Sequence, residues 1–283
     1  VHCGDILPIG GHSPMRIRTI VQPNDPYNRT QAPRQVSNEG NTVTPNQLSD
    51  QAIVSSPPRE GFLTGSFVWM FVGVLLSGVA AYFVATNEQL LQTVSDYWLI
   101  LLIGQLGLVF GIMFLINRIP STVALGLFFV YALTMGLVIG VIVYSFTYDP
   151  LAPGNISQSG MAGVVSAFLG AAAIFGGAAL YGYVTKRDLT SIGGILFMGL
   201  IGLIVFMFVQ LFFLPGNGAM NLIIGIAGVA IFTGLTAWDV QRLKDGKMPN
   251  VNKDSATVMG ALMLYLDFIN LFLFMLRIFG SSR

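Results

Sequence analysis

Long uncharged runs alternate with short polar segments after residue 60. The stretch 189–238 contains fifty uncharged residues, too many for one membrane helix, and the turn sequence Pro215-Gly216-Asn217-Gly218 divides it in two. Seven apolar runs result, at residues 61–87, 97–117, 119–148 and 161–184, at two positions within 189–238, and at 256–279. Because a helix needs about 20 apolar residues to cross hydrocarbon, the pattern predicts an all-α polytopic membrane protein with seven spanning helices.

The composition excludes several classes of protein. Hydrophobic residues make up 54% of the chain and charged residues only 10%, which is incompatible with a water-soluble globule. The formal net charge is +1, so no nucleic-acid partner is expected. The lone cysteine, Cys3, excludes a disulfide scaffold, and the only histidines, His2 and His12, exclude a histidine-based metal site or a Ser–His dyad inside the membrane.

Residues 1–60 differ from the rest of the chain. They hold eight of the thirteen prolines and a single aromatic residue, Tyr27. Such a segment buries too little apolar surface to offset its chain entropy, so we expect a disordered, Pro-rich cytoplasmic tail. No apolar core precedes Phe62, so the first hydrophobic run is predicted to remain as a spanning helix. The expected organisation is a tail at 1–60 and a transmembrane domain at 61–283.

Lysine and arginine lie before the first span and in every second connection between the spans. The residues concerned are Arg59, Arg118, Lys186, Arg187, Arg242, Lys244, Lys247 and Lys253. The connections at 88–96, 149–158 and 215–219 carry no lysine or arginine, so the positive-inside rule predicts a cytoplasmic N-terminus. Arg277 fits less well, and the last segment could cross fully or form a re-entrant hairpin; we expect the full crossing.

Some polar and small residues in the spans are expected to serve helix packing. Glycines four residues apart would allow backbones to approach closely; they are Gly107 with Gly111 and Gly136 with Gly140. Gln105 and Gln210 stand alone in apolar helices and are expected to be interhelical hydrogen-bond partners.

Asp267 lies near the middle of the last apolar segment, where a carboxylate costs about 2.5–3.5 kcal/mol on insertion scales. Such a residue indicates a functional site by default. Asn270, three residues on, shares its helix face and could hydrogen-bond in the same polar patch. The structural alternative is a protonated aspartate bonded to a neighbouring carbonyl as a contact between helices.

Asp239 lies at the cytoplasmic end of the sixth span. Arg242, at i+3, could simply pair with it, so a structural and a functional interpretation are equally supported by the spacing. Arg118 at the end of the second span is interpreted first as an orientation signal that reaches the headgroups. The sixth and seventh spans are expected to be antiparallel neighbours, so Asp239 and Asp267 could face each other and share a proton as a coupled pair. Such a pair would act as a pH sensor.

Two motifs resemble a known family. The sequences TAWDVQRLK (Thr236–Lys244) and LYLDFINLFLFMLRIFG (Leu264–Gly280) are similar to the closing motifs of the Bax inhibitor-1, or transmembrane Bax inhibitor motif, family, and the likeness extends over about residues 62–283. The resemblance implies a seven-helix fold with a central last helix wrapped by the other six, and a pH-sensitive calcium leak. It assigns Asp239 and Asp267 as proton-sensor and calcium-path residues, and Arg118 as a latch on Asp239.

The function expected from this resemblance is a calcium leak channel of a bacterial plasma membrane. Asp239 and Asp267 would bind calcium weakly and transiently, with Asn270, backbone carbonyls and water completing the shell, because calcium takes six to eight oxygen ligands. Partners are the lipid bilayer, calcium, protons and other membrane proteins; no cofactor and no enzymatic activity are expected. Two alternatives remain open, namely a proton-coupled calcium exchanger and a regulatory or scaffold protein acting on a membrane protease or stress pathway.

Overall fold

The computed structural model describes residues 35–36, 42–43, 60–148, 157–213, 218–248, 251 and 255–281. The chain divides into two units, Val1–Pro57 and Pro58–Arg283. In the first unit, the described residues form two short antiparallel strands, β1 (Gln35–Val36) and β2 (Thr42–Val43), with Gln35 opposite Val43. The predicted disordered tail therefore lies almost entirely outside the described residues.

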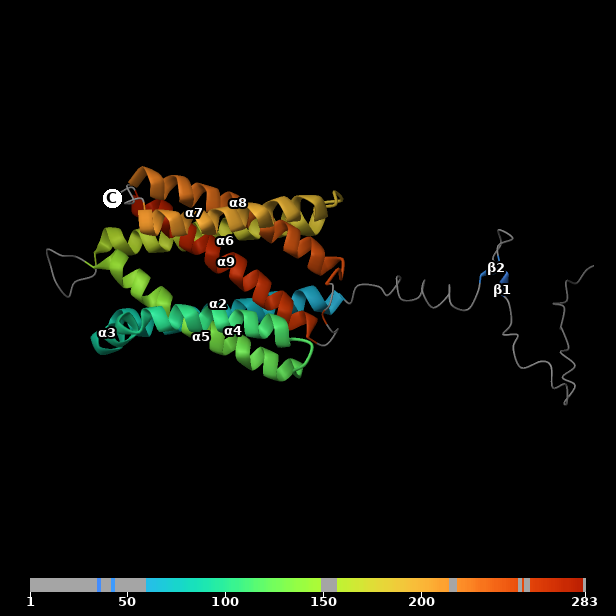
Figure 1. Ribbon diagram of the computed structural model, residues 1–283, viewed down its shortest axis with the longest axis horizontal. Helices are drawn as coiled ribbons and strands as arrows, with labels where there is room; N and C mark the ends of the chain where they lie inside the picture. The colour runs from blue at the N-terminus through green and yellow to red at the C-terminus, as the bar shows by residue number, and fades with distance from the viewer. Residues whose placement is uncertain are drawn as a thin grey trace, which may run out of the picture. The chain divides into compact units, whose positions relative to one another are not determined.

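The second unit is a bundle of helices (Figure 1). Within the described residues, seven helices are long and apolar enough to cross a membrane, as the hydropathy pattern predicts. They are α2 (Glu60–Thr86), α4 (Trp98–Leu115), α5 (Ser121–Thr147), α6 (Gln158–Val184), α7 (Thr190–Phe213), α8 (Gly218–Lys244) and α9 (Ala256–Ser281). The turn sequence between the fifth and sixth runs separates α7 from α8, although residues 214–217 themselves lie outside the described part.

One helix was not expected. Residues 88–96 form α3 (Glu88–Asp96), whereas the charge pattern indicated only a connection there. Asn87 caps this helix, because its side-chain oxygen accepts a hydrogen bond from the backbone N–H of Leu90 at 3.0 Å. The buried side chain of Val94 fixes one face of α3 to the bundle, so a polar cap and one apolar face suffice to make a helix too short to span.

The C-terminal helix α9 is the centre of the bundle. In its most apolar stretch 72% of the residues are buried, against 33% or less in every other candidate span. It packs against α2, α5, α6 and α8, while α4 lies outside against α5 and α7 lies outside against α8. Figure 1 shows α9 running obliquely between these groups. The centrality of α9 is confirmed; these four helices make its extended contacts, and α7 reaches it through a hydrogen bond between Gln210 and Arg277.

The connections α4–α5, α6–α7 and α8–α9 meet at one end of the bundle, on the right in Figure 1. We call this the basic end, because Arg118, Lys186, Arg187, Arg242, Lys244 and Lys247 lie there. The helix α9 starts at the basic end and runs without interruption to the opposite end. The last segment is therefore one full-length helix and not a re-entrant hairpin.

The surface of the bundle is apolar. Large side chains such as Phe114 (75% exposed), Met198 (75%) and Ile195 (71%) face outward. A soluble monomer does not expose contiguous apolar surface on this scale, whereas lipid tails solvate it. Together with the seven apolar helices, this surface makes the chain an integral, multi-pass membrane protein.

The close approach of helices predicted at the two glycine pairs is found at one pair and not at the other. On α5, a methyl group added to Gly140 would come within 2.6 Å of Val84 in α2, and one on Gly136 would meet the same helix at Ser77. The predicted close approach is thus confirmed for α5. On α4 it is wrong, because a methyl group on Gly107 or Gly111 would meet nothing within 4 Å. The glycine face of α4 does not contact a neighbouring helix.

Candidate functional site

Asp267 lies within the central helix α9 and is only 5% exposed. The helix places it there because Leu264 and Leu271, one turn to either side, are fully buried, so their common face points into the bundle. The side chain of Thr236 in α8 lies beside the Asp267 carboxyl group, and the Thr236 hydroxyl donates its hydrogen to the carbonyl of Phe232 at 2.8 Å. The Oδ2 atom of Asp267 has no hydrogen-bond partner among the described residues. A buried carboxyl oxygen without a partner is costly and marks a site that the fold maintains at the expense of stability.

Asp239 lies five residues before the end of α8 and is also buried, at 7% exposure. Its ionic partner is Arg242 on the next turn, with Nη1 3.9 Å from Oδ1. This distance is too long for a hydrogen bond, and Oδ1 has no hydrogen-bond partner in the described part of the chain. The guanidinium of Arg242 also lies 4.9 Å above the ring of Trp238. The ion pair is therefore loose, and the arginine is held in place largely by its aromatic neighbour.

The two aspartates belong to one buried site. The helices α8 and α9 pack closely, and the two carboxyl groups are near enough to interact electrostatically. Asp239 lies five residues from the basic end of α8, whereas Asp267 lies eleven residues from the basic end of α9. In straight antiparallel helices, at 1.5 Å per residue, this difference would place the two aspartates about 9 Å apart in depth. Thr236 lies one turn from Asp239 toward the level of Asp267 and contacts the latter, so it bridges this offset. No direct hydrogen bond joins the two carboxyl groups within the described residues.

The structure does not bring Arg118 to this site. Its side chain is exposed at the end of α4, and its backbone N–H donates to the carbonyl of Leu115 at 2.7 Å. Since α4 packs against α5 on the other side of the bundle, it has no extended contact with α8 (Figure 1). The cation beside Asp239 is Arg242 instead, because a residue at i+3 needs no approach between helices.

Asn270 was expected to hydrogen-bond in the same polar patch as Asp267, but its side chain bonds elsewhere. Its side-chain N–H donates to the carbonyl of Leu266, one turn earlier in α9, at 2.8 Å. It therefore bonds within its own helix, and in the described part of the chain no hydrogen bond joins it to Asp267. Of the predicted polar patch, the two aspartates are near enough to interact electrostatically, while the Asn270 amide bonds within its own helix.

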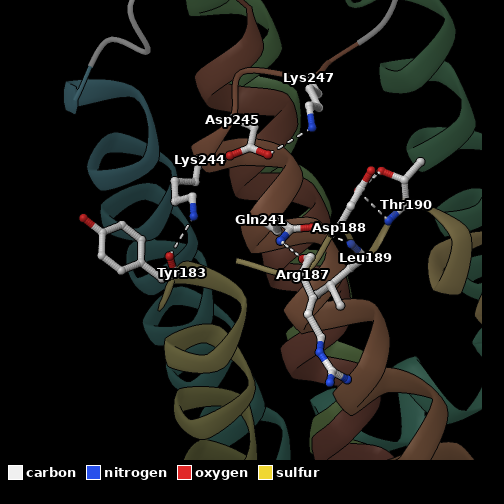
Figure 2. A network of polar contacts seen from close by, with 9 residues as sticks. All are labelled: Tyr183, Arg187, Asp188, Leu189, Thr190, Gln241, Lys244, Asp245 and Lys247. Atoms are coloured by element: carbon white, nitrogen blue, oxygen red, sulfur yellow. Dashed lines mark hydrogen bonds and ion pairs between the residues drawn. The ribbon is translucent and has the colours of Figure 1, made fainter. Parts of the chain in front are cut away.

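A second polar network fastens the α6–α7 connection to α8, two residues beyond Asp239. Gln241 is 6% exposed; its Nε2 donates to the carbonyl of Arg187 at 2.7 Å, and its Oε1 accepts from the N–H of Leu189 at 2.8 Å. Figure 2 shows the Gln241 side chain directed at this backbone, with Lys244 donating to the carbonyl of Tyr183 at 2.8 Å. The network fixes the end of α8 that carries Asp239.

Asp188 completes this connection by capping α7. Its Oδ1 accepts from the backbone N–H of Thr190 at 3.0 Å and from the Thr190 hydroxyl at 2.5 Å (Figure 2). These hydrogen bonds, first the one from the hydroxyl, hold the pKa of Asp188 below its usual value of 3.8. Asp188 is fully exposed and is a capping residue, unlike the two buried aspartates.

Other polar residues of the spans hold helices together. Arg277 of α9 donates to Oε1 of Gln210 in α7 at 2.7 Å and to Oδ1 of Asn221 in α8 at 2.8 Å. The expectation that Gln210 is an interhelical partner is thus confirmed. Gln105 is buried and its Nε2 has no hydrogen-bond partner in the described region, so for that residue the expectation stays a prediction.

A group of hydrogen bonds involves Tyr265, two residues before Asp267 on the side of α9 toward its basic end. The Oγ of Ser77 in α2 lies 2.6 Å from the hydroxyl oxygen of Tyr265 and 2.7 Å from the carbonyl oxygen of Ala132 in α5. Ser77 also lines a cavity of about 530 Å³ bounded by α2, α3, α5, α6 and α9. The cavity reaches Phe268 and Ile269, the two residues after Asp267, but Asp267 does not line it.

The described residues offer a cation few ligands. No group of three or more His, Cys, Asp or Glu side chains lies close enough to hold a metal ion in this part of the chain. Calcium takes six to eight oxygen ligands, and tight sites gather several carboxylates. Two carboxylates and a threonine hydroxyl can interact with a passing cation but cannot form a storage site.

Sequence reasoning missed Thr236 and Gln241. Each is a neutral polar residue near the end of an apolar helix, and such residues are frequent in membrane helices without forming a site. A usable signal was their position within the TAWDVQRLK segment, where both flank Asp239. Their partners, Asp267 and the α6–α7 connection, are distant in sequence.

Comparison with known proteins shows which family and which relatives the chain resembles. The family described as "Inhibitor of apoptosis-promoting Bax1" matches residues 59–283. An uncharacterized protein of Deinococcus radiodurans is 37% identical over 225 residues, covering 78% of this chain and 90% of its own. Inner membrane protein YbhL of Escherichia coli is 37% identical over 237 residues, covering 80% and 95% respectively. An uncharacterized protein of Borreliella burgdorferi is 36% identical over 234 residues, covering 80% and 94%.

Proposed function

The chain belongs to the Bax inhibitor-1 family, and from this premise we propose that it is a pH-sensitive calcium leak channel of a bacterial inner membrane. The relative YbhL is named an inner membrane protein, which supports the location. The clustering of lysine and arginine at the basic end supports an orientation with that end in the cytoplasm. The proposal assigns the protein no catalytic role.

The observation that carries the proposal is the pair of buried aspartates between α8 and α9. Each has a carboxyl oxygen without a hydrogen-bond partner among the described residues, inside an otherwise apolar bundle. A purely structural contact between helices would satisfy these oxygens, because unpaired buried polar groups are costly. A site that exchanges protons and passes cations must instead keep oxygens available.

The proposed gate is the shared protonation of Asp239 and Asp267. Two neighbouring carboxylates in a poorly hydrated site do not easily both ionise, so they bind one proton between them. Protonation of Asp239 would remove its attraction to Arg242, which lies only at 3.9 Å and is already partly solvent-exposed. The charge at this end of α8 would then change next to α9; Arg242 lies on the same helix as Asp239 and does not itself join α8 to α9. In this proposal Arg242 sets the charge of the pair, whereas the family resemblance assigns Arg118 as a latch on Asp239.

Calcium is the proposed cargo and binds only in passing. The ionised pair attracts a divalent cation, while the small number of ligands lets it leave again. Since conduction requires weak binding, a site of two carboxylates with the Thr236 hydroxyl suits a leak better than a calcium store.

The experiment is calcium flux into proteoliposomes that contain the purified full-length chain and an enclosed calcium indicator. With equal pH on both sides, we expect influx to accelerate on acidification between about pH 8 and pH 5, as a shared proton binds. Asp239→Asn and Asp267→Asn should each change the flux and remove its pH response. Asp245→Asn is the matched control, because Asp245 is an acid at the same end of α8 that pairs with Lys247 at 3.2 Å, outside the buried site.

Two results would contradict the proposal. Unchanged flux and pH response in both asparagine variants would exclude the aspartate pair as the gate. Calcium movement against its own gradient, driven by an imposed pH difference, would show a proton-coupled exchanger, since a leak cannot move calcium uphill.

A further inference from the structure

The cavity between α2, α3, α5, α6 and α9 has the dimensions of a ligand site. Its volume is about 530 Å³, within the range of about 300–1,000 Å³ typical of small-molecule sites. Its deep part is formed by buried side chains, among them Ser77, Ile139 and Phe268. Exposed side chains, Tyr82 and Tyr148, form its mouth, which lies at the end of the bundle opposite to the basic end.

The deep part of the cavity favours an apolar occupant. Its walls are aliphatic and aromatic, and the hydroxyl groups that line it are already hydrogen-bonded. Thr147 donates to the carbonyl of Val143 at 3.0 Å, and Ser77 lies within hydrogen-bonding distance of the carbonyl of Ala132 and the hydroxyl of Tyr265. These groups need no further polar partner, so they do not select a polar ligand body.

The mouth of the cavity favours a cation. Glu88, at the start of α3, presents an exposed carboxylate there, and no lysine or arginine is present among the described lining residues. Tyr144 and Tyr148 line the same region, with ring centroids 5.7 Å apart and planes inclined by 40°. Aromatic rings grouped around a carboxylate recognise quaternary ammonium groups, because ring faces and the carboxylate both attract a positive charge.

We propose that this cavity binds an amphipathic quaternary ammonium compound. The cationic head lies between Glu88 and the rings of Tyr144 and Tyr148, and the apolar body extends along Ile139 toward Phe268. The phosphate group of an anionic lipid would be repelled by Glu88 and would meet no cationic side chain in the described lining. The site is separate from the aspartate pair, so binding does not depend on calcium conduction.

The test is isothermal titration of benzyltriethylammonium into the purified full-length chain in dodecyl maltoside, with the micelle alone as blank. Sodium benzenesulfonate, an anion with a similar ring, is titrated in parallel. We expect saturable binding of the cation and none of the anion. Glu88→Gln should weaken binding by about fivefold, because exposed ion pairs contribute modestly. Tyr148→Leu should weaken it by about twofold to fivefold through loss of a cation–π contact at an exposed site.

Asp96→Asn is the matched control. Asp96 is the exposed acid at the other end of α3 and does not line the cavity, so its removal should leave the affinity unchanged. Equal thermal unfolding midpoints of the variants would show that they fold alike. The proposal is overturned if the cation gives no heat beyond the micelle blank, or if the sulfonate binds equally well. It is also overturned if Glu88→Gln and Asp96→Asn weaken binding to the same extent, which would indicate general surface charge.

Discussion

The hydroxyl groups of Ser77 and Tyr265 join α2 to α9, and removing one or the other should lower the free energy of unfolding by different amounts. The Ser77 Oγ lies 2.9 Å from the carbonyl oxygen of Gly73 and 2.7 Å from that of Ala132. Its single hydrogen therefore goes to a carbonyl, and Ser77 accepts the hydrogen bond that the Tyr265 hydroxyl donates over 2.6 Å. Tyr265 is completely buried, so its hydroxyl has no access to water.

The magnitudes follow from what each substitution leaves behind. Tyr265→Phe removes one hydrogen bond while Ser77 keeps its carbonyl partner, so we expect a loss of about 1 kcal/mol in the free energy of unfolding. Ser77→Ala leaves the buried hydroxyl of Tyr265 without its hydrogen-bond partner, which should lower the free energy of unfolding by about 2 kcal/mol. The double variant leaves no phenolic hydroxyl unpaired, so it should cost about 1–2 kcal/mol, less than the sum of about 3 kcal/mol for the two single variants. The resulting coupling energy of about 1–2 kcal/mol is at the upper end of values measured for hydrogen bonds between membrane helices, which average about 0.6 and reach about 1.7 kcal/mol.

The assay is reversible unfolding of the four proteins by sodium dodecyl sulfate in mixed micelles, followed by circular dichroism. A double-mutant cycle isolates the pairwise energy from the separate packing effects of each substitution. A coupling energy near zero, or a larger cost for Tyr265→Phe than for Ser77→Ala, would refute the assignment of donor and acceptor.

Three further predictions concern packing, a connection and a cap. Gly140→Ala should lower the free energy of unfolding by about 1–3 kcal/mol by overpacking against α2, while Gly111→Ala should change it by less than about 0.5 kcal/mol; the same detergent unfolding measures both. Gln241→Ala should speed hydrogen exchange in the α6–α7 connection, because two hydrogen bonds to its backbone are lost; mass spectrometry would detect this, and unchanged exchange would contradict it. The pKa of Asp188 lies below 3.8, so its cap stabilises α7 above that pH and is lost as the pH falls through the lowered value; an NMR titration should show Thr190→Val returning the pKa toward 3.8.

Hydropathy predicts the spans well because the bilayer requires about 20 apolar residues per helix whatever the fold. The midplane position of Asp267 could be predicted for the same reason, since a carboxylate there is too costly to be incidental. Which face of a helix contacts another helix is not encoded in this way. Lipid tails are as apolar as leucine side chains, so Gly111 on a face without helix contact and Gly140 in a helix contact have the same local signal.

At the site, the contacts between helices were harder to predict from the sequence than the helices themselves. The i+3 spacing alone brings Arg242 to Asp239, whereas the absence of Arg118 from the site follows from the placement of α4 outside α5, which the sequence does not indicate. Thr236 gains its importance from the stagger of α8 against α9, which hydropathy does not determine. The helix α3 was not predicted from the sequence because it has many polar residues and an apolar face only a few residues long.

The most direct test of the central proposal is to measure the protonation of the aspartate pair and the calcium flux in the same proteoliposomes. Infrared difference spectroscopy reports the protonated carboxyl stretch, and Asp267→Asn and Asp239→Asn identify its source. We expect a carboxyl band that titrates as one shared proton, disappears in either variant, and follows the same pH curve as the calcium flux. A flux that changes with pH while the carboxyl band of the pair stays constant would contradict the proposed gate.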